Sequence, residues 1–347
     1  MPLLSRFAQI AMFAALSMTL APEAAAADNK LVRARACRGD YTKLCPGVKM
    51  GGGRIFACLS EHAAELSEQC RAALQGDGGQ TPQRAAIPSG VEVMRDLAYG
   101  PDPLQRLDVY LPSHPQNAPV LLMVHGGGWV FGDKALPSTV ENKVAHWAPK
   151  GFIFVSVNYR MIPAADPLEQ ARDVARALAL VQSKAASWGG DPTKIVLMGH
   201  SAGGHLVSLL AADPGIAQGL GAKPWLGTVS LDSGAIDVVA IMRNRHFKFY
   251  DRIFGADPTF WRSASPLERL AGNGRPILLV CSTAIAASCR HTAAFAQKAA
   301  AMGTPAKVIP VSLTHKQINV SLGQNKAYTD SIEAFLRTLG LGDALPK

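Results

Sequence analysis

A serine in a glycine-framed turn is the clearest chemical feature of this sequence. Gly199-His200-Ser201-Ala202-Gly203 follows the β-type run Lys194–Met198 and passes directly into a helix-like stretch. Glycine two positions on either side of Ser201 lets a strand and a helix approach closely while the serine takes a strained backbone conformation. The pattern therefore predicts an exposed, nucleophilic serine.

A glycine-rich loop earlier in the chain is suited to stabilise the negative charge that develops during attack by such a serine. His125-Gly126-Gly127-Gly128-Trp129 follows the apolar run Val120–Val124, as an oxyanion-binding loop should follow a strand. In an acyl transfer, the oxyanion would be held by the backbone N–H groups of Gly127, Gly128 and Ala202. Side chains at the glycine positions would block the approach of the substrate carbonyl.

His315 is the predicted general base. It lies directly after the last β-type run, and the ends of parallel strands converge at the edge where the serine turn lies. His291, at the start of a helical stretch, is a second candidate. Three other histidines are expected to have structural roles: His125 would order the glycine loop by a hydrogen bond, and His200 and His205 would pack or face the rim of the pocket.

Alternating β-type and helical segments must position these residues. Helical stretches are predicted near residues 138–149, 167–188, 202–212, 290–302 and 325–339. Apolar runs predict eight strands, at Val91–Ala98, Arg106–Leu111, Val120–Val124, Phe152–Asn158, Lys194–Met198, Leu226–Leu231, Ile277–Ser282 and Val308–Leu313. This order predicts an α/β fold with a mostly parallel sheet covered on both faces, and with the first two strands as an antiparallel hairpin at its edge.

The motifs together resemble a known superfamily. From about Val91 to Leu341 the chain resembles the hormone-sensitive-lipase-like esterases of the α/β-hydrolase superfamily, and among them bacterial esterases related to feruloyl and acetyl-xylan esterases and to kynurenine formamidases. The resemblance is carried by His125 to Trp129, Val157 to Arg160, Gly190 to Pro192, Gly199 to Gly203, Phe254 to Pro258, Trp261 to Pro266 and Thr314 to Asn319. It implies an α/β-hydrolase domain over residues 91–342, with Ser201, His315 and the oxyanion-hole groups in the roles given above and with no metal or cofactor.

The catalytic acid does not follow from the resemblance. Relatives place an aspartate shortly after the strand equivalent to Ile277–Ser282, whereas this chain has no acidic residue between Glu268 and Asp330. Asp232 or Asp237, after the preceding strand, could reach His315 instead, and Asp232 is the preferred choice. Alternatively a backbone carbonyl or water orients His315, which would leave a slow Ser-His dyad, or catalysis is lost.

The six cysteines indicate disulfides. Residues 31–75 hold four of them and resemble the cysteine-rich repeat of the Golgi cysteine-rich glycoprotein, with two helical runs joined by a glycine turn. A helical hairpin of this kind pairs Cys37 with Cys70 and Cys45 with Cys58. A zinc site is the alternative for this cluster. Cys281 and Cys289 bracket the acid-free loop and are expected to form a third bridge, with two free thiols as the alternative.

The amino terminus predicts export. Residues 1–27 have a charged start, about 15 apolar residues and a small-residue cleavage site, which is the pattern of a signal peptide cleaved after Ala27. An uncleaved anchor is the alternative, but the apolar stretch is shorter than the roughly 20 residues that span a bilayer. We therefore expect a soluble periplasmic or secreted protein, in which residues 76–90 link the cysteine-rich module to the large domain.

The net charge of the chain gives little information about its binding partners. The net charge is +9, but lysine and arginine are scattered, with no basic run, so nucleic-acid binding is not expected. The cysteine-rich module is a candidate contact with the cell envelope or with another protein. The segment 238–270 carries many aromatic side chains and is interpreted as a lid or as the wall of an acyl pocket.

Three functions remain in view. The first is a serine carboxylic-ester hydrolase acting on small or aryl acyl esters through a Ser201 acyl-enzyme. The second is an arylformamidase-type amide hydrolase. The third is a non-catalytic binding protein on a degenerate hydrolase fold, which the acid-free interval favours and the serine turn and oxyanion loop oppose.

Overall fold

A computed structural model describes residues 36–48, 58–59, 62, 65–75 and 85–345. The expected signal peptide of residues 1–27, the glycine turn near residues 51–53 and most of the linker lie outside the described residues.

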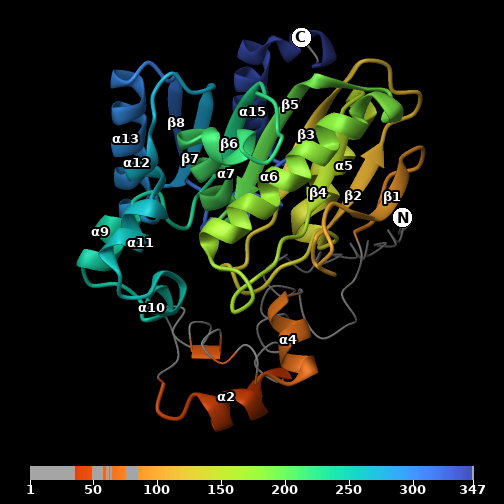
Figure 1. Cartoon of the computed structure of the whole chain (residues 1–347). Coiled ribbons are helices and arrows are strands. Elements are labelled where there is room, and N and C mark those ends of the chain that lie inside the picture. Colours follow the sequence, from red (N-terminus) through yellow and green to blue (C-terminus); the bar gives the residue numbers. More distant parts are fainter. Residues whose placement is uncertain (1–35, 49–57, 60–61, 63–64, 76–84, 346–347) are drawn as a thin grey trace, which may run out of the picture.

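An eight-stranded sheet forms the centre of the large domain (Figure 1). Its strand order is β1-β2-β4-β3-β5-β6-β7-β8, with β2 antiparallel to both neighbours and the pairs from β4 to β8 parallel. The strands are β1 Glu92–Ala98, β2 Arg106–Leu111, β3 Ala118–Val124, β4 Ile153–Val157, β5 Gly190–His200, β6 Gly227–Leu231, β7 Ile277–Ser282 and β8 Ala306–Val311. All eight predicted strands are present, and the predicted α/β class with a mostly parallel sheet is confirmed.

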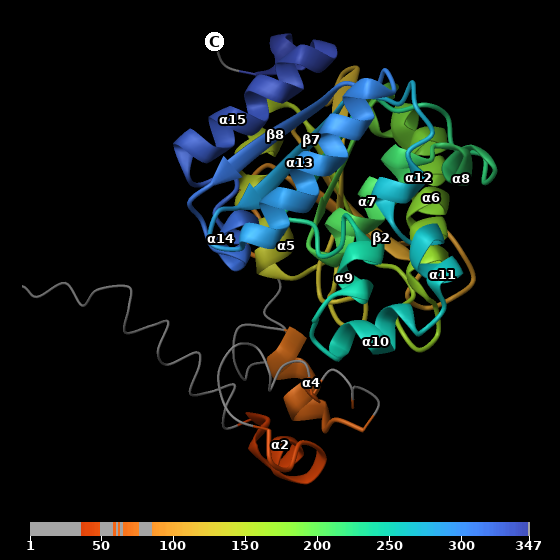
Figure 2. The ribbon, with the colours of Figure 1, turned by 90° about the vertical axis from the view of Figure 1, so that its left-hand side faces the viewer.

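Helices cover both faces of this sheet (Figures 1 and 2). The longer ones are α5 Pro137–Trp147, α6 Pro167–Lys184, α7 Ala202–Ala212, α13 Ala286–Ala301 and α15 Lys326–Leu336. Shorter helices are α8 Gly215–Gln218, α9 Val238–Arg243, α10 Phe249–Phe254, α11 Pro258–Ser263, α12 Pro266–Arg269 and α14 His315–Val320. The turns η1 Ala148–Lys150, η2 Ala185–Trp188, η3 Arg337–Leu341 and η4 Gly342–Ala344 follow helices or end the described chain.

Side-chain alternation along β3 explains the two-sided packing. Leu122 belongs to the core shared with α6 and α7, whereas Leu121 and Met123 belong to the core shared with α5 and α15. All of β3 is buried, because successive side chains point to opposite faces and each face is covered. The central strands are therefore fixed in register by apolar burial on both sides.

The carboxyl ends of β5 to β8 meet at one edge. His200, the last residue of β5, pairs with Leu231, the last residue of β6. Ser201 and Asp232, which follow these two residues, are thereby brought close together, and α14 begins shortly after β8. The helices α9, α10 and α14 lie at this end of the sheet (Figure 2).

The cysteine-rich module contains α2 Arg38–Leu44 and α4 Glu68–Gln75. Its cysteines form the expected pairs, Cys37 with Cys70 and Cys45 with Cys58. Asp40 joins the two helices by accepting hydrogen bonds from the Ser67 N–H at 2.9 Å and the Ser67 hydroxyl at 2.6 Å. The four cysteines are buried and belong to the same apolar cluster as Phe131 of the large domain.

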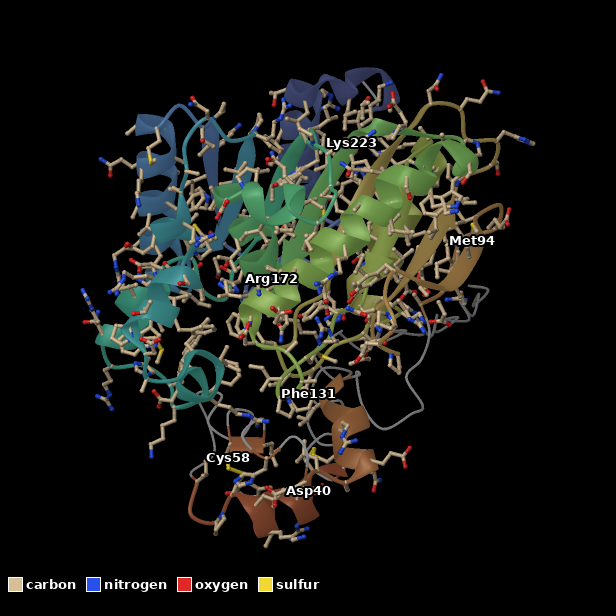
Figure 3. The ribbon with its side chains drawn as sticks, viewed as in Figure 1. Asp40, Cys58, Met94, Phe131, Arg172 and Lys223 are labelled. Carbon is tan, nitrogen blue, oxygen red and sulfur yellow. A yellow bond between two sulfur atoms is a disulfide. The ribbon has the colours of Figure 1, made fainter. Side chains whose placement is uncertain are left out.

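The module lies at the end of the large domain where the parallel strands finish, beyond α10 (Figures 1 and 2). Figure 3 places Phe131, from the loop after β3, at the end of the domain that faces this module. The cysteine-rich unit therefore lies on the same side of the molecule as the predicted site.

Candidate active site

Ser201 occupies a strained turn between β5 and α7. Its φ of 56° and ψ of −116° are unusual for a residue with a side chain. A Cβ atom at Gly199 would lie 2.3 Å from the Gly203 carbonyl oxygen, and one at Gly203 would lie 2.2 Å from the Val124 carbonyl oxygen. Both positions require glycine, because the helix start packs directly on the strand ends.

His315 lies in the first turn of α14, a short helix that begins just beyond β8. Thr314 caps this helix, and its side chain and that of Gln317 form a reciprocal capping box. The Nε2 atom of His315 lies 2.9 Å from the Ser201 Oγ atom. The opposite nitrogen, Nδ1, lies 2.6 Å from the Asp232 Oδ2 atom. A carboxylate can only accept here, so Nδ1–H donates to Asp232 and Nε2 is free to accept the serine proton.

Asp232 directly follows β6 and is held by three donors. Its backbone has a φ of 45°, and the residue is 1% exposed. Besides His315 at Oδ2, the Oδ1 atom accepts hydrogen bonds from the Ser282 N–H at 3.0 Å and the Ser288 hydroxyl at 2.6 Å. Burial acts to raise the pKa of Asp232, but the hydrogen bonds from His315, Ser288 and Ser282 and the electrostatic interaction with the His315 ring outweigh it and hold that pKa below its ordinary value. The carboxylate is therefore ionised at neutral pH.

The loop after β3 presents backbone N–H groups next to the serine turn. Gly127 and Gly128 have φ values of 127° and 61°, and a Cβ atom at Gly127 would lie 1.9 Å from the Phe131 carbonyl oxygen. Among the described residues, none accepts a hydrogen bond from the N–H groups of Gly127, Gly128 or Ala202. These groups are those expected to stabilise an oxyanion.

His125 orders this loop. Its Nδ1–H donates to the Gly126 carbonyl at 2.8 Å, and its ring stacks on Tyr159 with ring centres 4.4 Å apart. Burial lowers the pKa of His125, which keeps the ring neutral. The geometry agrees with the structural role expected for this histidine.

The other histidines near the serine are also neutral and hydrogen-bonded. Burial lowers the pKa of His200 to about 3, and its Nε2–H donates to the His315 carbonyl at 2.9 Å. Burial lowers the pKa of His205 to about 4; its Nε2–H donates to the Ala264 carbonyl and its Nδ1 accepts from the Trp129 indole. Both rings pack and position backbone groups, as the sequence predicts.

The alternative site residues lie outside this chain of contacts. Asp237 is the N-cap of α9 and accepts a hydrogen bond from the Ala240 N–H at 2.8 Å. His291 lines a neighbouring cavity and is half-buried, and no hydrogen bond joins it to Ser201 within the described residues. Of the alternatives left open by the sequence, the structure brings Asp232 to His315 and leaves Asp237 and His291 apart.

The segment 238–270 folds into α9 to α12 and covers part of the site. Phe249 and Tyr250 of α10 lie against the Trp129 ring, with ring centres 6.0 Å and 6.2 Å away. The Phe249 ring lies so close to the oxyanion loop that a Cβ atom at Gly128 would be 2.8 Å from it. This placement agrees with the interpretation of the segment as the wall of a pocket.

Cys281 and Cys289 form the third predicted disulfide, which joins the end of β7 to the first turn of α13. In the part of the chain that the structure describes, no group of three or more histidine, cysteine, aspartate or glutamate side chains is arranged to hold a metal ion. Within the same residues, no helix has the length and hydropathy needed to cross a bilayer.

A buried lysine supports the helix that carries His315. Lys143 of α5 is 1% exposed and donates to the carbonyls of Asn319 at 2.7 Å and Ser138 at 3.1 Å. Burial lowers the pKa of Lys143 to about 7. Between that value and the ordinary value of 10.5, the unfolded chain binds a proton at this position that the folded chain does not. Stability should therefore rise with pH across this window.

We expect the free energy of unfolding in urea to respond differently to pH in wild type and in Lys143→Met. From pH 6.5 to 9.5 the wild type should gain roughly 2 to 4 kcal/mol relative to the variant, because each pKa unit is worth about 1.4 kcal/mol. Parallel pH profiles for the two proteins would show that Lys143 titrates normally in the folded state.

Comparison with known families extends the geometric description. The BD-FAE family model matches residues 107–224, which include the oxyanion loop and Ser201. The chain is 31% identical to esterase LipC of Mycobacterium tuberculosis over 54% of this chain and 49% of that protein. It is 35% identical to isoprenylcysteine alpha-carbonyl methylesterase ICME of Arabidopsis thaliana over 34% of this chain and 27% of that protein. The chain thus spans about half or less of the length of these curated relatives.

Solved structures with the same architecture include two esterases. A truncated carbohydrate esterase from gut microbiota is similar with a TM-score of 0.62 and 19% identity, over 74% of this chain and 99% of that chain. Esterase B from Lactobacillus rhamnosis is similar with a TM-score of 0.60 and 20% identity, over 92% and 96% of the two chains. These likenesses show the α/β-hydrolase fold.

Proposed function

We propose that this protein is a serine carboxylic-ester hydrolase that acts on small or aryl acyl esters. The observation that carries the proposal is the continuous chain from Ser201 Oγ through His315 to Asp232, with distances of 2.9 and 2.6 Å, beside the N–H groups of the glycine loop. The relatives named as esterases support the reaction class. The contact between Asp232 and His315 supports this proposal over a non-catalytic binding role, because it offers His315 a carboxylate from outside the acid-free interval.

The proposed reaction has two steps. The Ser201 Oγ atom attacks the ester carbonyl carbon while His315 Nε2 takes its proton, and the oxyanion is held by the N–H groups of Gly127, Gly128 and Ala202. The bond to the alcohol oxygen then breaks, and Nε2–H protonates that oxygen. A water molecule, deprotonated by the same nitrogen, attacks the acyl-enzyme, which releases the carboxylic acid and restores the serine hydroxyl.

The signal peptide predicted from the sequence and the three disulfides support a location outside the cytoplasm, in the periplasm or the medium. Purified protein spanning residues 28–347 should hydrolyse p-nitrophenyl acetate, and a p-nitrophenyl phosphonate should add its mass to the peptide that contains Ser201. Absence of both turnover and labelling would overturn the proposal. Comparing aryl esters with N-formylkynurenine separates ester hydrolysis from formamide hydrolysis.

A further inference from the structure

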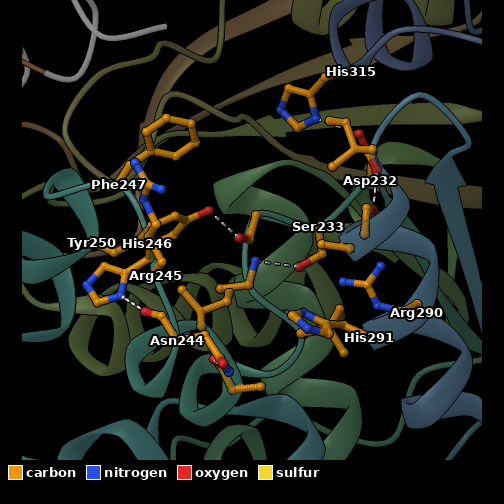
Figure 4. A pocket seen from close by; sticks show the side chains of 18 residues that line it. Asp232, Ser233, Asn244, Arg245, His246, Phe247, Tyr250, Arg290, His291 and His315 are labelled. Atoms are coloured by element: carbon orange, nitrogen blue, oxygen red, sulfur yellow. Dashed lines mark hydrogen bonds and ion pairs between the residues drawn. The ribbon is translucent and has the colours of Figure 1, made fainter. Parts of the chain in front are cut away.

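A cavity of about 900 Å³ adjoins the Asp232–His315 pair (Figure 4). It lies between the loop after β6, the helices α9 and α10, and the first turns of α13. Its apolar lining includes Ile241, Phe247 and Ile285. Phe247 is 58% exposed and Ile285 is 43% exposed, which is unusual for large apolar side chains. A cavity of this size with an apolar wall is typical of a small-molecule site.

The cavity also carries positive charge. Arg245 and Arg290 both line it and lie on opposite sides in Figure 4. Within the described residues, neither arginine forms an ion pair with a carboxylate. Among the described residues that line the cavity, Asp232 is the one carboxylate, and it is already bound by His315, Ser282 and Ser288. His246 lines the cavity too and contacts Asp251, which does not line it.

We infer that the preferred substrate is an ester of an apolar, preferably aromatic, alcohol that carries an anionic group such as a carboxylate. The inference rests on the proposed esterase function. The alcohol leaves with the proton from His315 Nε2, so it must lie near that ring, and the cavity is lined by His315 and Asp232 but not by Ser201. The apolar wall would hold the body of the alcohol, while Arg245 and Arg290 would hold its charge.

The test compares two acetates that differ in charge, 4-carboxyphenyl acetate and the neutral 4-carbamoylphenyl acetate. In wild type, kcat/KM for the carboxylate ester should exceed that for the neutral ester, and added salt should reduce the difference. Arg245→Gln and Arg290→Gln should each lower kcat/KM for the carboxylate ester about 5- to 10-fold and leave the neutral ester within about 2-fold. Arg243→Gln, an exposed residue of α9 that does not line the cavity, is the matched control.

The outcomes separate this inference from the proposed function. If neither ester is hydrolysed, the esterase proposal fails. If both are hydrolysed and the arginine variants affect them equally, the charge recognition is wrong. A third ester, mono(4-carbamoylphenyl) succinate, carries its charge on the acyl side. If the arginine variants lower kcat/KM for this ester only, the cavity holds the acyl group, and the assignment to the alcohol is overturned.

A second inference rests on a separate observation, the support of Asp232. The two groups that donate to its Oδ1 atom belong to Ser282 and Ser288. Ser282 adjoins Cys281 and Ser288 adjoins Cys289, and these cysteines are bonded to each other with Cα atoms 5.1 Å apart. The disulfide therefore fixes the spacing of the two donors.

We propose that Ser288 is a positioning residue, and that the Cys281–Cys289 disulfide keeps it in place to orient Asp232 towards His315. Without this bond the first turn of α13 could move away from β7, and the Ser288 hydroxyl would leave the carboxylate. Asp232 would then keep the donors from Ser282 and His315 but lose the fixed angle of its carboxylate plane. Reduction of this disulfide should accordingly slow catalysis and leave substrate binding nearly unchanged.

Ser288→Ala should lower kcat for p-nitrophenyl acetate about 10-fold with KM changed less than 2-fold, and Ser288→Thr should restore most of it. Dithiothreitol should lower kcat of wild type by a similar factor but have no effect on Cys281→Ser/Cys289→Ser. The triple variant Cys281→Ser/Cys289→Ser/Ser288→Ala should show a smaller loss of kcat than the product of the losses in Cys281→Ser/Cys289→Ser and in Ser288→Ala. The Cys45→Ser/Cys58→Ser variant, which keeps the third bridge, should stay sensitive to dithiothreitol. Full activity of the Ser288→Ala protein, or of reduced wild type in which Cys281 and Cys289 are alkylated, would overturn this proposal.

Discussion

Replacing Ser201 with alanine should reduce kcat for p-nitrophenyl acetate by about 10⁶-fold, the scale of loss when the nucleophile is removed from a serine triad. The alanine retains the backbone N–H groups at the site but cannot form an acyl-enzyme. The strained backbone conformation at position 201 belongs to the turn and does not depend on the hydroxyl group. We therefore expect the variant to fold and to unfold at a temperature close to that of wild type.

The same variant should lose phosphonate labelling, whereas Ser263→Ala, which changes a half-buried serine of α11, should keep both labelling and turnover. Turnover of the Ser201→Ala protein within 100-fold of wild type would mean that another group attacks the ester. A water activated by His315 would be the first candidate, since the ring would still accept a proton at Nε2. Burst kinetics would distinguish the two routes, because only wild type accumulates an acyl-enzyme.

Local patterns were sufficient to predict the tight turns that hold Ser201, Gly127 and Gly128. Each depends on a close backbone approach that only glycine-rich turns permit, and such turns are visible over a few residues. The helix α14 also has a local signal that sequence reasoning did not use: Thr314 and Gln317 stand at the spacing of a capping box. That signal would have placed His315 in the first turn of a helix.

Choosing between Asp232 and Asp237 required long-range information. Both follow β6 by a few residues, but the pairing of Leu231 with His200 fixes only the strand end close to the serine. Asp237 precedes the apolar start of α9 and has the position of an N-cap, which is a usable signal against its role as the acid. No sequence signal indicates Ser288, because its contact with Asp232 depends on how α13 packs against β7 and β8.

Asp232→Asn should lower kcat by about 10³- to 10⁴-fold while preserving the fold. The amide can donate as well as accept, so it can stabilise the His315 tautomer that carries its proton on Nε2 and cannot accept the serine proton. The charge that stabilises the protonated imidazole is lost at the same time. The matched control is Asp237→Asn, which weakens a helix cap and should change turnover less than 3-fold.

The opposite outcome is equally specific. If Asp232 were only a structural acceptor for Ser282 and Ser288, the asparagine variant would show a lower unfolding temperature with turnover nearly unchanged. Measuring kcat and thermal unfolding on the same preparation separates these cases.

Placing an aspartate at Ala286 or Ala287 tests whether the acid could come from the loop after β7, where relatives carry it. In the wild-type background we expect no gain, because His315 Nδ1 already donates to Asp232 at 2.6 Å and a second carboxylate would repel the first. In the Asp232→Asn background, recovery of 10-fold or more would show that the loop position is geometrically competent. Failure to recover, together with the loss in Asp232→Asn, would assign the acid to the end of β6, where the register of the sheet brings it beside the nucleophile.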